Sequence, residues 1–463
     1  MFHWIEIRAL LSRFLYCQAA TLLIPFSFSL FVAEPSHPFA FALLITLCVA
    51  FLLQFSSLKK TGEVRRREGI FLVVLIWIAA AFFAAIPFYT SRLLPIPLDA
   101  FFEALSGLTT TGTTLIADVE SANLSLLLWR SLLQWFGGIG VIVLFLMILP
   151  VLRVGGKVLY ETEATGPIKE GISPLAKVAA TKIAVLYAGL TLISFFLLMA
   201  TNPTLPIFDA LNLSLTTIST GGFSIKNNSI DAYPSLMTRA VLVFFMILGS
   251  INFSLYFQFF RKTLTDFRFF LWSLAVGCLG VALFLPTDLV WTGCFQAIST
   301  QTTTGYMIGN SLSWPIGSQT ILLLLMFVGG MAGSTAGGIK TSRFYLLFQI
   351  IHHRLELIFR PTVVRALRIG DQEIDEPKAA TLLTFFCVVG LSSAIGVIAF
   401  IADGLDLITS IQMVASFFNN VGINPSVIGL SPFSKVLSMF SMLLGRLEYF
   451  VVILTFFPFF WKK

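Results

Sequence analysis

The chain has 463 residues, of which 57% are hydrophobic and 11% are charged, and its mean hydropathy is +0.90. An ordinary soluble domain is about 25% charged, so this composition excludes a soluble globular protein. Long segments such as 69–88 are apolar throughout instead of alternating in polarity, which indicates membrane-spanning helices and excludes a β-barrel. The net charge of +7 is clustered between apolar segments, which is typical of membrane topology and not of nucleic-acid binding.

The first apolar segment follows Arg8 and Arg13 and continues to about Val32. It is longer than the apolar part of a signal peptide, and no cleavage pattern stands out, so we expect a retained helix. The five cysteines stand singly in apolar sequence without metal-binding spacing, and we interpret them as core residues.

Most of the 30 Lys and Arg residues gather in six places, which indicate the topology. These are Arg8 with Arg13, 59–67, 153–182, 261–268, 340–378, and Lys462 with Lys463. Because basic residues concentrate on the cytoplasmic side, both termini are predicted to be cytoplasmic. Each of the last four segments that lie between these basic clusters must then leave the cytoplasm and return. We therefore expect an all-α polytopic, multi-pass protein in a lipid bilayer.

Each of these four intervals contains two spanning segments around a shorter one of about a dozen residues, which is too short to cross a bilayer. The short segments align on Gly112, Gly222, Gly305 and Gly422. Thirteen residues earlier stand Asp99, Asp209, Thr292 and Thr409, which we interpret as N-cap residues of short helices. Thr, Ser or Asn occupies the second and third positions before each glycine. The unit of helix, half-helix and helix therefore repeats four times.

Non-helical backbone at membrane depth is tolerated only inside protein or along a water-filled cavity, because its amides and carbonyls otherwise lack partners. Four such loops around one axis would form a ring of carbonyl oxygens that replaces the hydration shell of a cation. The negative C-terminal ends of the short helices also favour a cation. A single Thr- and Gly-rich stretch such as 105–114 is more often a packing patch between helices, but four in one register favour a cation-selective pore.

The four loops, with "WRSLLQWFGGIGVIVL" (129–144), "GGMAGSTAGGIKTSR" (329–343) and "GRLEYF" (445–450), resemble the Trk/Ktr/HKT superfamily of potassium transporters, most closely its bacterial TrkH branch. The resemblance implies two N-terminal helices followed by four repeats of helix, pore loop and helix around a central ion pore. The corresponding segments are 1–60 for the two-helix unit, 61–153 for repeat 1 (pore loop 99–114), 154–262 for repeat 2 (pore loop 209–224), 263–360 for repeat 3 (pore loop 292–307, glycine-rich gating loop 329–340) and 361–463 for repeat 4 (pore loop 409–424).

The resemblance further implies potassium uptake across a bacterial inner membrane through a filter lined by backbone carbonyls. The potassium-binding positions that it implies are Thr110, Thr111, Gly112, Thr220, Gly221, Gly222, Thr303, Thr304, Gly305, Asn420, Val421 and Gly422. In repeat 2 the tandem Gly221 and Gly222 leave the register open by one residue, and we choose Gly222 because Phe223 follows it. In plant relatives a serine at the first filter position accompanies sodium transport, so Gly112 favours potassium.

A glycine-rich stretch interrupts the apolar helix predicted over 316–351, and the resemblance assigns it to a gating loop. A flexible linker or tight helix packing is the alternative. The gating residues are Gly329, Gly330, Gly333, Gly337, Gly338, Lys340 and, further along the chain, Arg446. Arg446 stands in an apolar run, where a charge is costly unless it faces the protein interior. We expect it below the filter and against the glycine-rich loop, with an ion pair to Glu448 as the alternative.

The sequence contains no catalytic constellation, so we expect a transporter and not an enzyme, with potassium as its substrate and no cofactor. Nucleotide regulation would need a partner on the cytoplasmic segments 153–182 and 340–378. The resemblance implies a homodimer with a cytoplasmic nucleotide-binding regulatory subunit of the TrkA type.

Arg130 and Arg239 are interpreted as anchors at the outer interface. For Glu103, local hydrogen bonding and negative potential at the pore mouth stay open. The alternative function is a proton- or sodium-coupled secondary cation transporter, although such carriers tend to have inverted repeats and intramembrane acids.

Overall fold

The computed structural model describes residues 3–55, 66–152, 174–258, 265–360, 367–369, 372–374, 376–423 and 427–461. Several residues assigned above to the cytoplasm lie outside the described residues, namely the basic segments within 59–65, 153–173, 261–262 and 361–366 and the terminal Lys462 and Lys463. Seven of the described helices are long and apolar enough to cross a membrane. The predicted all-α polytopic class is therefore confirmed.

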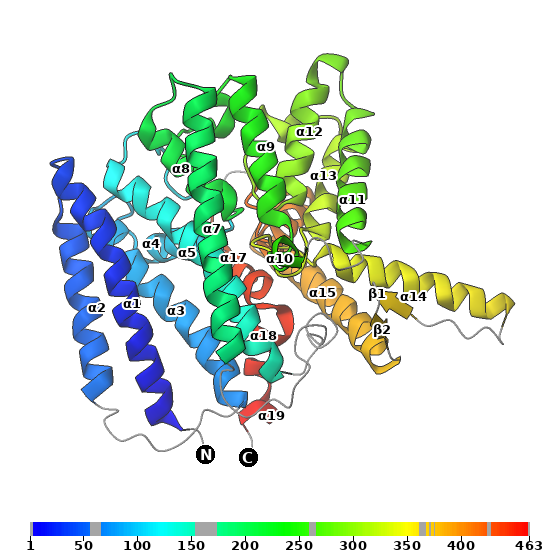
Figure 1. The fold of residues 1–463 in the computed structure, drawn as a ribbon, viewed down its shortest axis with the longest axis horizontal. Helices are drawn as coiled ribbons and strands as arrows, with labels where there is room; N and C mark the ends of the chain where they lie inside the picture. The colour runs from blue at the N-terminus through cyan, green and yellow to red at the C-terminus, as the bar shows by residue number, and fades with distance from the viewer. Residues whose placement is uncertain are drawn as a thin grey trace.

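The N-terminal helices α1 (Trp4–Phe31) and α2 (His37–Phe55) lie side by side at one edge of the molecule (Figure 1). The Ser12 hydroxyl on α1 donates a hydrogen bond to the Ala50 carbonyl on α2 (2.7 Å). Large apolar side chains such as Phe31 and Phe51 point outward and are exposed. An apolar outer surface of this kind suits contact with lipid.

Four repeats follow the N-terminal pair. Repeat 1 consists of α3 (Arg66–Thr90), the short α4 (Pro97–Leu108) and α5 (Leu124–Leu152). Repeat 2 consists of α7 (Pro174–Thr201), the short α8 (Ile207–Ile218), η1 (Ser229–Ala232), α9 (Leu236–Ser250) and α10 (Leu255–Gln258). Repeat 3 consists of α11 (Thr265–Ala282), η2 (Thr287–Leu289), the short α12 (Val290–Gln301), η3 (Ser311–Ser313), α13 (Ile316–Val328) and α14 (Thr341–Phe359).

Repeat 4 begins after a small antiparallel hairpin of β1 (Leu367–Ile369) and β2 (Gln372–Ile374). It consists of α15 (Glu376–Ala402), the short α16 (Leu407–Phe418), α17 (Pro432–Leu447), α18 (Tyr449–Phe456) and α19 (Pro458–Trp461). The helix α19 ends at the same end of the molecule at which α1 begins (Figure 1).

The second helix of repeats 2, 3 and 4 is interrupted. The sequence predicted the break in repeat 3, but it predicted uninterrupted spanning helices in repeats 2 and 4. These helices stop at Ser250, Val328 and Leu447. The backbone at the breaks finds partners in neighbouring repeats, since the amide of Met331 donates to the Ser250 carbonyl (3.0 Å). Such breaks are compatible with a membrane interior because protein, and not lipid, surrounds them.

The predicted helix caps are wrong by three residues. Each short helix begins earlier than expected, so that Asp99, Asp209, Thr292 and Thr409 are the third residue of their helices. Only in α16 does a side chain cap the helix among the four, because Asp406 accepts from the Thr409 amide. Asp99 instead accepts from Lys435 (2.6 Å) and Asp209 from the Tyr233 hydroxyl (2.9 Å). The acids therefore bind neighbouring segments instead of their own helix ends.

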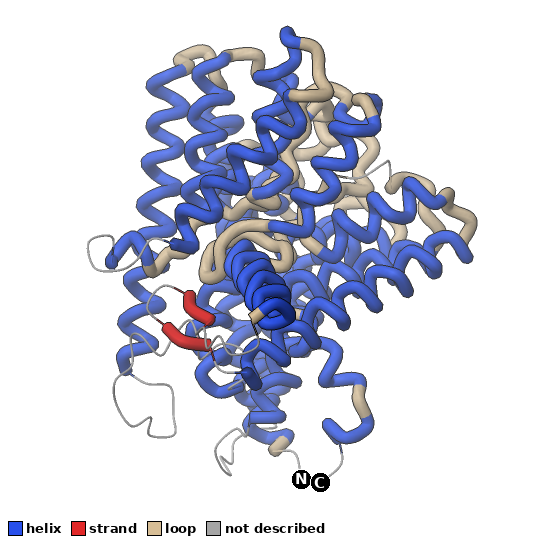
Figure 2. Tube along the Cα trace, turned by 90° about the vertical axis from the view of Figure 1, so that its right-hand side faces the viewer, coloured by secondary structure: helices blue, strands red, loops and turns tan. Residues whose placement is uncertain are grey.

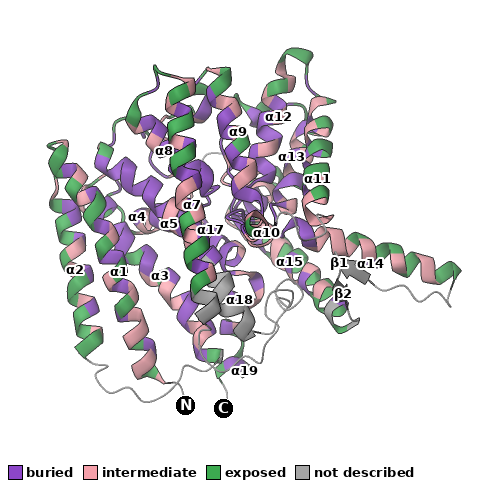
Figure 3. Cartoon of the chain, in the orientation of Figure 1, coloured by how far each residue is buried: buried purple, intermediate pink, exposed green. Residues whose placement is uncertain are grey.

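Burial increases toward the middle of the molecule, where the short helices and the irregular segments lie (Figure 3). Loop segments run among the helices at mid-height and not only at the two ends (Figure 2). Many buried side chains there are Ser or Thr, and Thr109, Thr110 and Thr111 are at most 1% exposed. The molecule thus has a polar centre and an apolar periphery.

Arg130 is buried, which corrects its prediction as an anchor at the outer interface. Its Nε atom pairs with Glu103 on the short helix α4 (2.9 Å), and both side chains are at most 2% exposed. It also donates to the Ser224 carbonyl of repeat 2 (3.1 Å) and lies over the Phe223 ring. Glu103 also accepts from Thr114 and from the amide of Leu115 (both 2.9 Å), so the predicted local hydrogen bonds are present. The ion pair thus joins α4 to α5 within repeat 1, and the bond from Arg130 to Ser224 connects it to repeat 2.

We expect Arg130→Leu to destabilise the fold by about 3–5 kcal/mol, because it leaves the Glu103 carboxylate buried without its charge partner. The apparent unfolding temperature in detergent, followed by tryptophan fluorescence, measures the effect. Arg239→Ala is the matched control, since the Arg239 pair with Asp231 spans 3.6 Å and is partly exposed, and such pairs contribute about 0–1 kcal/mol. Equal unfolding temperatures for the two variants would contradict the structural role of the buried pair.

Candidate functional site

The four short helices end at equivalent positions. Each contains 12 residues, and each stops four residues before the aligned glycine. The backbone φ then repeats in every loop, with values of 54°, 50°, 55° and 54° at Thr110, Thr220, Thr303 and Asn420. Two residues later φ is 81°, 73°, 81° and 80° at Gly112, Gly222, Gly305 and Gly422. Repeat 2 therefore matches the others at Gly222 and not at Gly221.

The left-handed conformation at Thr110, Thr220, Thr303 and Asn420 is unusual because these residues carry side chains. Such positions cost about 1–3 kcal/mol each and persist only where the surrounding structure enforces them. Here the same strained conformation recurs at one position of all four repeats. Strain of this kind concentrates at functional sites, so the loops are the candidate site.

The aligned glycines and the neighbouring carbonyls form a closed ring. A Cβ atom at Gly112, Gly222, Gly305 or Gly422 would lie 1.8–2.2 Å from a carbonyl oxygen of the next repeat, the oxygens being those of Gly221, Thr304, Val421 and Thr111 in turn. The fourth contact returns to repeat 1, so the four loops surround one axis. No residue with a side chain fits at these glycines without displacing a carbonyl.

The amide before each glycine turns back toward its own helix and donates to a carbonyl of the last helical turn. These bonds, each 2.9 Å long, join Thr111 to Ser106, Gly221 to Thr216, Thr304 to Ser299 and Val421 to Ser416. Within the described chain, no hydrogen bond reaches the carbonyl oxygens of Thr111, Thr304 or Val421. Carbonyl oxygens that lack protein partners are able to replace the water around a cation.

The loops are also joined at their outer ends. Lys435 of repeat 4 pairs with Asp99 of repeat 1. Asn227 of repeat 2 accepts from the Val119 amide of repeat 1 (2.8 Å). The Gly309 amide of repeat 3 donates to Asp231 of repeat 2 (2.6 Å). Polar contacts therefore hold neighbouring repeats together around the axis outside the ring itself.

The glycine-rich stretch 329–340 is a buried loop between α13 and α14 that contacts the pore loops directly. The amide of Gly337 donates to the Thr303 hydroxyl (2.6 Å), and Thr220 donates to Thr335 (3.3 Å). A Cβ atom at Gly337 would lie 2.3 Å from the Asn419 carbonyl oxygen. The loop therefore packs against repeats 2, 3 and 4, which does not fit the flexible linker considered as an alternative.

Arg446 lies against the glycine-rich loop and is 3% exposed. Its guanidinium donates to the Thr335 carbonyl of that loop (2.8 Å) and to the Gly137 carbonyl of α5 (2.9 Å). Glu448 is not its partner, because Glu448 pairs with Arg343 at the start of α14 (2.6 Å). The positive side chain thus joins repeats 1 and 4 to the loop.

The remaining predicted gating residues differ in their surroundings. Gly329, Gly333 and Gly338 have positive φ, whereas the space beside Gly330 is filled by Ala336 and Ser250. Lys340 has a φ of 83°, and its ammonium group donates to the Ala336 carbonyl of the same loop. The C-terminal end of the loop is therefore bound to the middle of the same loop by the Lys340 side chain.

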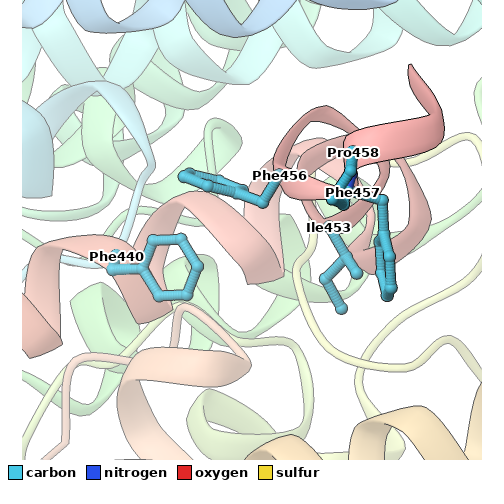
Figure 4. Close-up of a pocket in the computed structure, with 5 residues that line it drawn as sticks. All are labelled: Phe440, Ile453, Phe456, Phe457 and Pro458. Atoms are coloured by element: carbon cyan, nitrogen blue, oxygen red, sulfur yellow. The ribbon is translucent and has the colours of Figure 1, made fainter. Parts of the chain in front are cut away.

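Two further features of the described chain bear on where a cation could bind. No cluster of His, Cys, Asp or Glu suited to a metal ion occurs among the described residues. A pocket between α17, α18 and α19 is lined by Phe440, Ile453, Phe456, Phe457 and Pro458 (Figure 4). Its lining is apolar, so the pocket provides no ligand for a cation.

Sequence reasoning missed Gln134, which contacts the ring from α5. Its side chain is fully buried and bonds to the Gly221 carbonyl (2.6 Å) and the Phe223 amide (3.0 Å). A signal was present, since Gln134 follows Arg130 by four residues and therefore lies on the same face of an apolar helix. Both residues face repeat 2.

The comparisons with known proteins match the chain along nearly its whole length. The family model described as "Cation transport protein" (TrkH) matches residues 36–275 and 263–463. The Trk system potassium uptake protein TrkH of Escherichia coli K12 is 32% identical, over 96% of each chain. TrkI of Halomonas elongata is 29% identical, over 99% of this chain and 97% of its own.

The fold is likewise similar to a solved structure. The crystal structure of the potassium transporter TrkH from Vibrio parahaemolyticus superposes with a TM-score of 0.90 at 27% identity and covers 100% of both chains. The matching family is one of cation transport proteins, which agrees with the expectation that the chain is not an enzyme. From the family model, the relatives and the fold together, the chain belongs to the TrkH family of cation transport proteins.

Proposed function

We propose that this protein takes up potassium across the cytoplasmic membrane through the ring formed by its four pore loops. The observation that carries the proposal is the closed set of contacts between each aligned glycine and a carbonyl of the next repeat. Relatives of similar length are named potassium uptake proteins. The ion-binding positions are the twelve residues Thr110–Gly112, Thr220–Gly222, Thr303–Gly305 and Asn420–Gly422.

Backbone carbonyl oxygens coordinate the cation in this proposal. A dehydrated cation needs oxygen ligands, and the free carbonyls of Thr111, Thr304 and Val421 supply them without an ionised side chain. The C-terminal ends of the four short helices add negative potential toward the axis. Glycine at the aligned position keeps the ring open, because any side chain there would meet a carbonyl oxygen.

We further propose that the loop 329–340 is the gate, held by Arg446. In the conformation described, the loop binds Thr303 and Thr220 directly beside the ring. Arg446 bonds to the loop and brings a positive charge close to the pathway, which raises the barrier for cations. Movement of the loop would take both the loop itself and the positive charge of Arg446 away from the pathway.

Regulation belongs to a partner in this proposal. The protein acts as a homodimer in the inner membrane, both termini are cytoplasmic, and a nucleotide-binding subunit of the TrkA type docks on its cytoplasmic face. The support is the family membership, the basic cytoplasmic segments of the sequence, and the beginning of α1 at the same end as the end of α19 (Figure 1).

Purified protein in liposomes is expected to carry rubidium or potassium down its gradient, with the same flux whether or not a proton or sodium gradient is imposed. Isotope uptake, together with single-channel recording, measures this. The matched control is empty liposomes of the same lipid composition. Flux that requires a proton or sodium gradient would instead establish the coupled secondary transporter.

Gly112→Ser is expected to lower the preference for potassium over sodium by about tenfold, equivalent to about 1.4 kcal/mol. The added Cβ atom would meet the Gly221 carbonyl oxygen and strain a backbone with a φ of 81°. Competition between labelled rubidium and sodium in the liposome assay measures the ratio. Gly189→Ser is the control, because the space beside Gly189 on α7 is open. An unchanged ratio for Gly112→Ser would disprove the filter register.

Arg446→Ala is expected to raise potassium flux severalfold, because it removes both the bond to Thr335 and the positive charge beside the pathway. Arg446→Gln separates these two effects, since the amide still donates a hydrogen bond but carries no charge. Both variants are compared with the unmodified protein at equal reconstituted amounts. If folded protein of both variants conducts no faster than the unmodified chain, Arg446 is structural and not part of a gate.

A further inference from the structure

The four pore loops are not equivalent in how their ring carbonyls are bound. Three of the carbonyl oxygens that face a glycine of the preceding repeat receive no hydrogen bond within the described residues, namely those of Thr111, Thr304 and Val421. The fourth, that of Gly221, accepts from Nε2 of Gln134 at 2.6 Å. A single side chain thus distinguishes repeat 2 from the other repeats.

Gln134 holds loop 2 at two points on either side of Gly222. Its amide nitrogen donates to the Gly221 carbonyl, and its amide oxygen accepts from the Phe223 backbone amide (3.0 Å). Only one orientation of the side-chain amide satisfies both bonds, because a carbonyl needs a donor and an N–H needs an acceptor. Gln134 is 0% exposed, so water does not compete for either bond.

Gln134 also explains why repeat 2 has two consecutive glycines. A Cβ atom at Gly221 would lie 2.4 Å from Cδ, 2.5 Å from Oε1 and 2.8 Å from Nε2 of Gln134. Repeats 1 and 3 have a threonine at the equivalent position, and there Thr111 and Thr304 bond to the threonine two residues earlier (2.8 and 2.9 Å). In repeat 2 the glutamine from α5 occupies the space of that side chain.

We propose that Gln134 is a positioning residue that sets the ion preference of the pore through the Gly221 carbonyl. Its hydrogen bond draws electron density from that oxygen and fixes its direction. A weaker oxygen ligand that does not turn inward favours the larger, more easily dehydrated potassium ion over sodium. This inference rests on the proposed function, because it assumes that the ring carbonyls bind the transported cation.

The inference predicts that Gln134→Leu lowers the preference for potassium over sodium by about fivefold, which is the effect of one hydrogen bond of about 1 kcal/mol. Labelled rubidium and sodium uptake into liposomes gives the ratio, and the unfolding temperature reports stability separately. If the unmodified protein carries no potassium, the proposed function fails. If it does, but folded Gln134→Leu keeps the same ratio, only the role of Gln134 fails.

Gln296→Leu is the matched control. Gln296 is also fully buried and also holds a loop at two points, since it donates to the Tyr306 carbonyl (3.3 Å) and accepts from the Ile308 amide (3.1 Å). The Tyr306 carbonyl is not one of the ring oxygens, so the ion preference is expected to stay unchanged. An equal loss of preference in both variants would mean that any weakened loop has this effect and would overturn the proposal.

A second pair of variants keeps the test decisive if Gln134→Leu does not fold. Gly221→Thr alone is expected to disrupt the filter, because its side chain overlaps Gln134. The double variant Gln134→Ala with Gly221→Thr removes that overlap and gives repeat 2 the threonine of repeats 1 and 3. We expect it to restore flux but not the full potassium preference. Recovery of the complete preference would show that the Gln134 bond is dispensable for selectivity and would contradict the proposal.

Discussion

The structure depends on one constraint, which is that backbone inside a membrane must find partners in protein. The four pore loops leave the helical conformation at mid-height, and lipid cannot satisfy their amides and carbonyls. The amides turn back to their own helices through four equivalent bonds. The carbonyls then face the glycines of the neighbouring repeats, and a ring around one axis is the arrangement that closes all four contacts.

The same constraint explains where charges are buried. The Glu103 and Arg130 pair joins two helices of repeat 1 and contacts repeat 2, and both ions find additional hydrogen bonds there. Arg446 has no carboxylate partner among the described residues and instead donates to two backbone carbonyls, that of Thr335 in the loop 329–340 and that of Gly137 within the continuous helix α5. A cation held only by carbonyl dipoles is less well compensated than a paired one, which suits the gating role proposed above for Arg446.

The fourfold pattern is approximate, and its exceptions carry information. Repeat 1 keeps a continuous second helix, whereas in repeat 3 the buried loop 329–340 separates α13 from α14. Repeat 2 alone has a tandem glycine, because Gln134 fills the volume that a threonine side chain fills elsewhere. A pore built from one chain is able to differentiate its four quarters in this way, while a symmetric tetramer of identical chains cannot.

The sequence by itself determined the membrane class, the four repeats and the aligned glycines, because hydropathy and the recurrence of small polar residues are local properties of the chain. It also indicated the helix break at 329–340 and the unusual burial of Arg446. Contacts between distant segments were decided only by the tertiary structure. Asp99 binds Lys435 instead of capping its helix, Arg130 pairs with Glu103, and Gln134 reaches Gly221 across a repeat boundary. Each of these side chains had several possible partners, and only the packing of the repeats around the axis selects one of them.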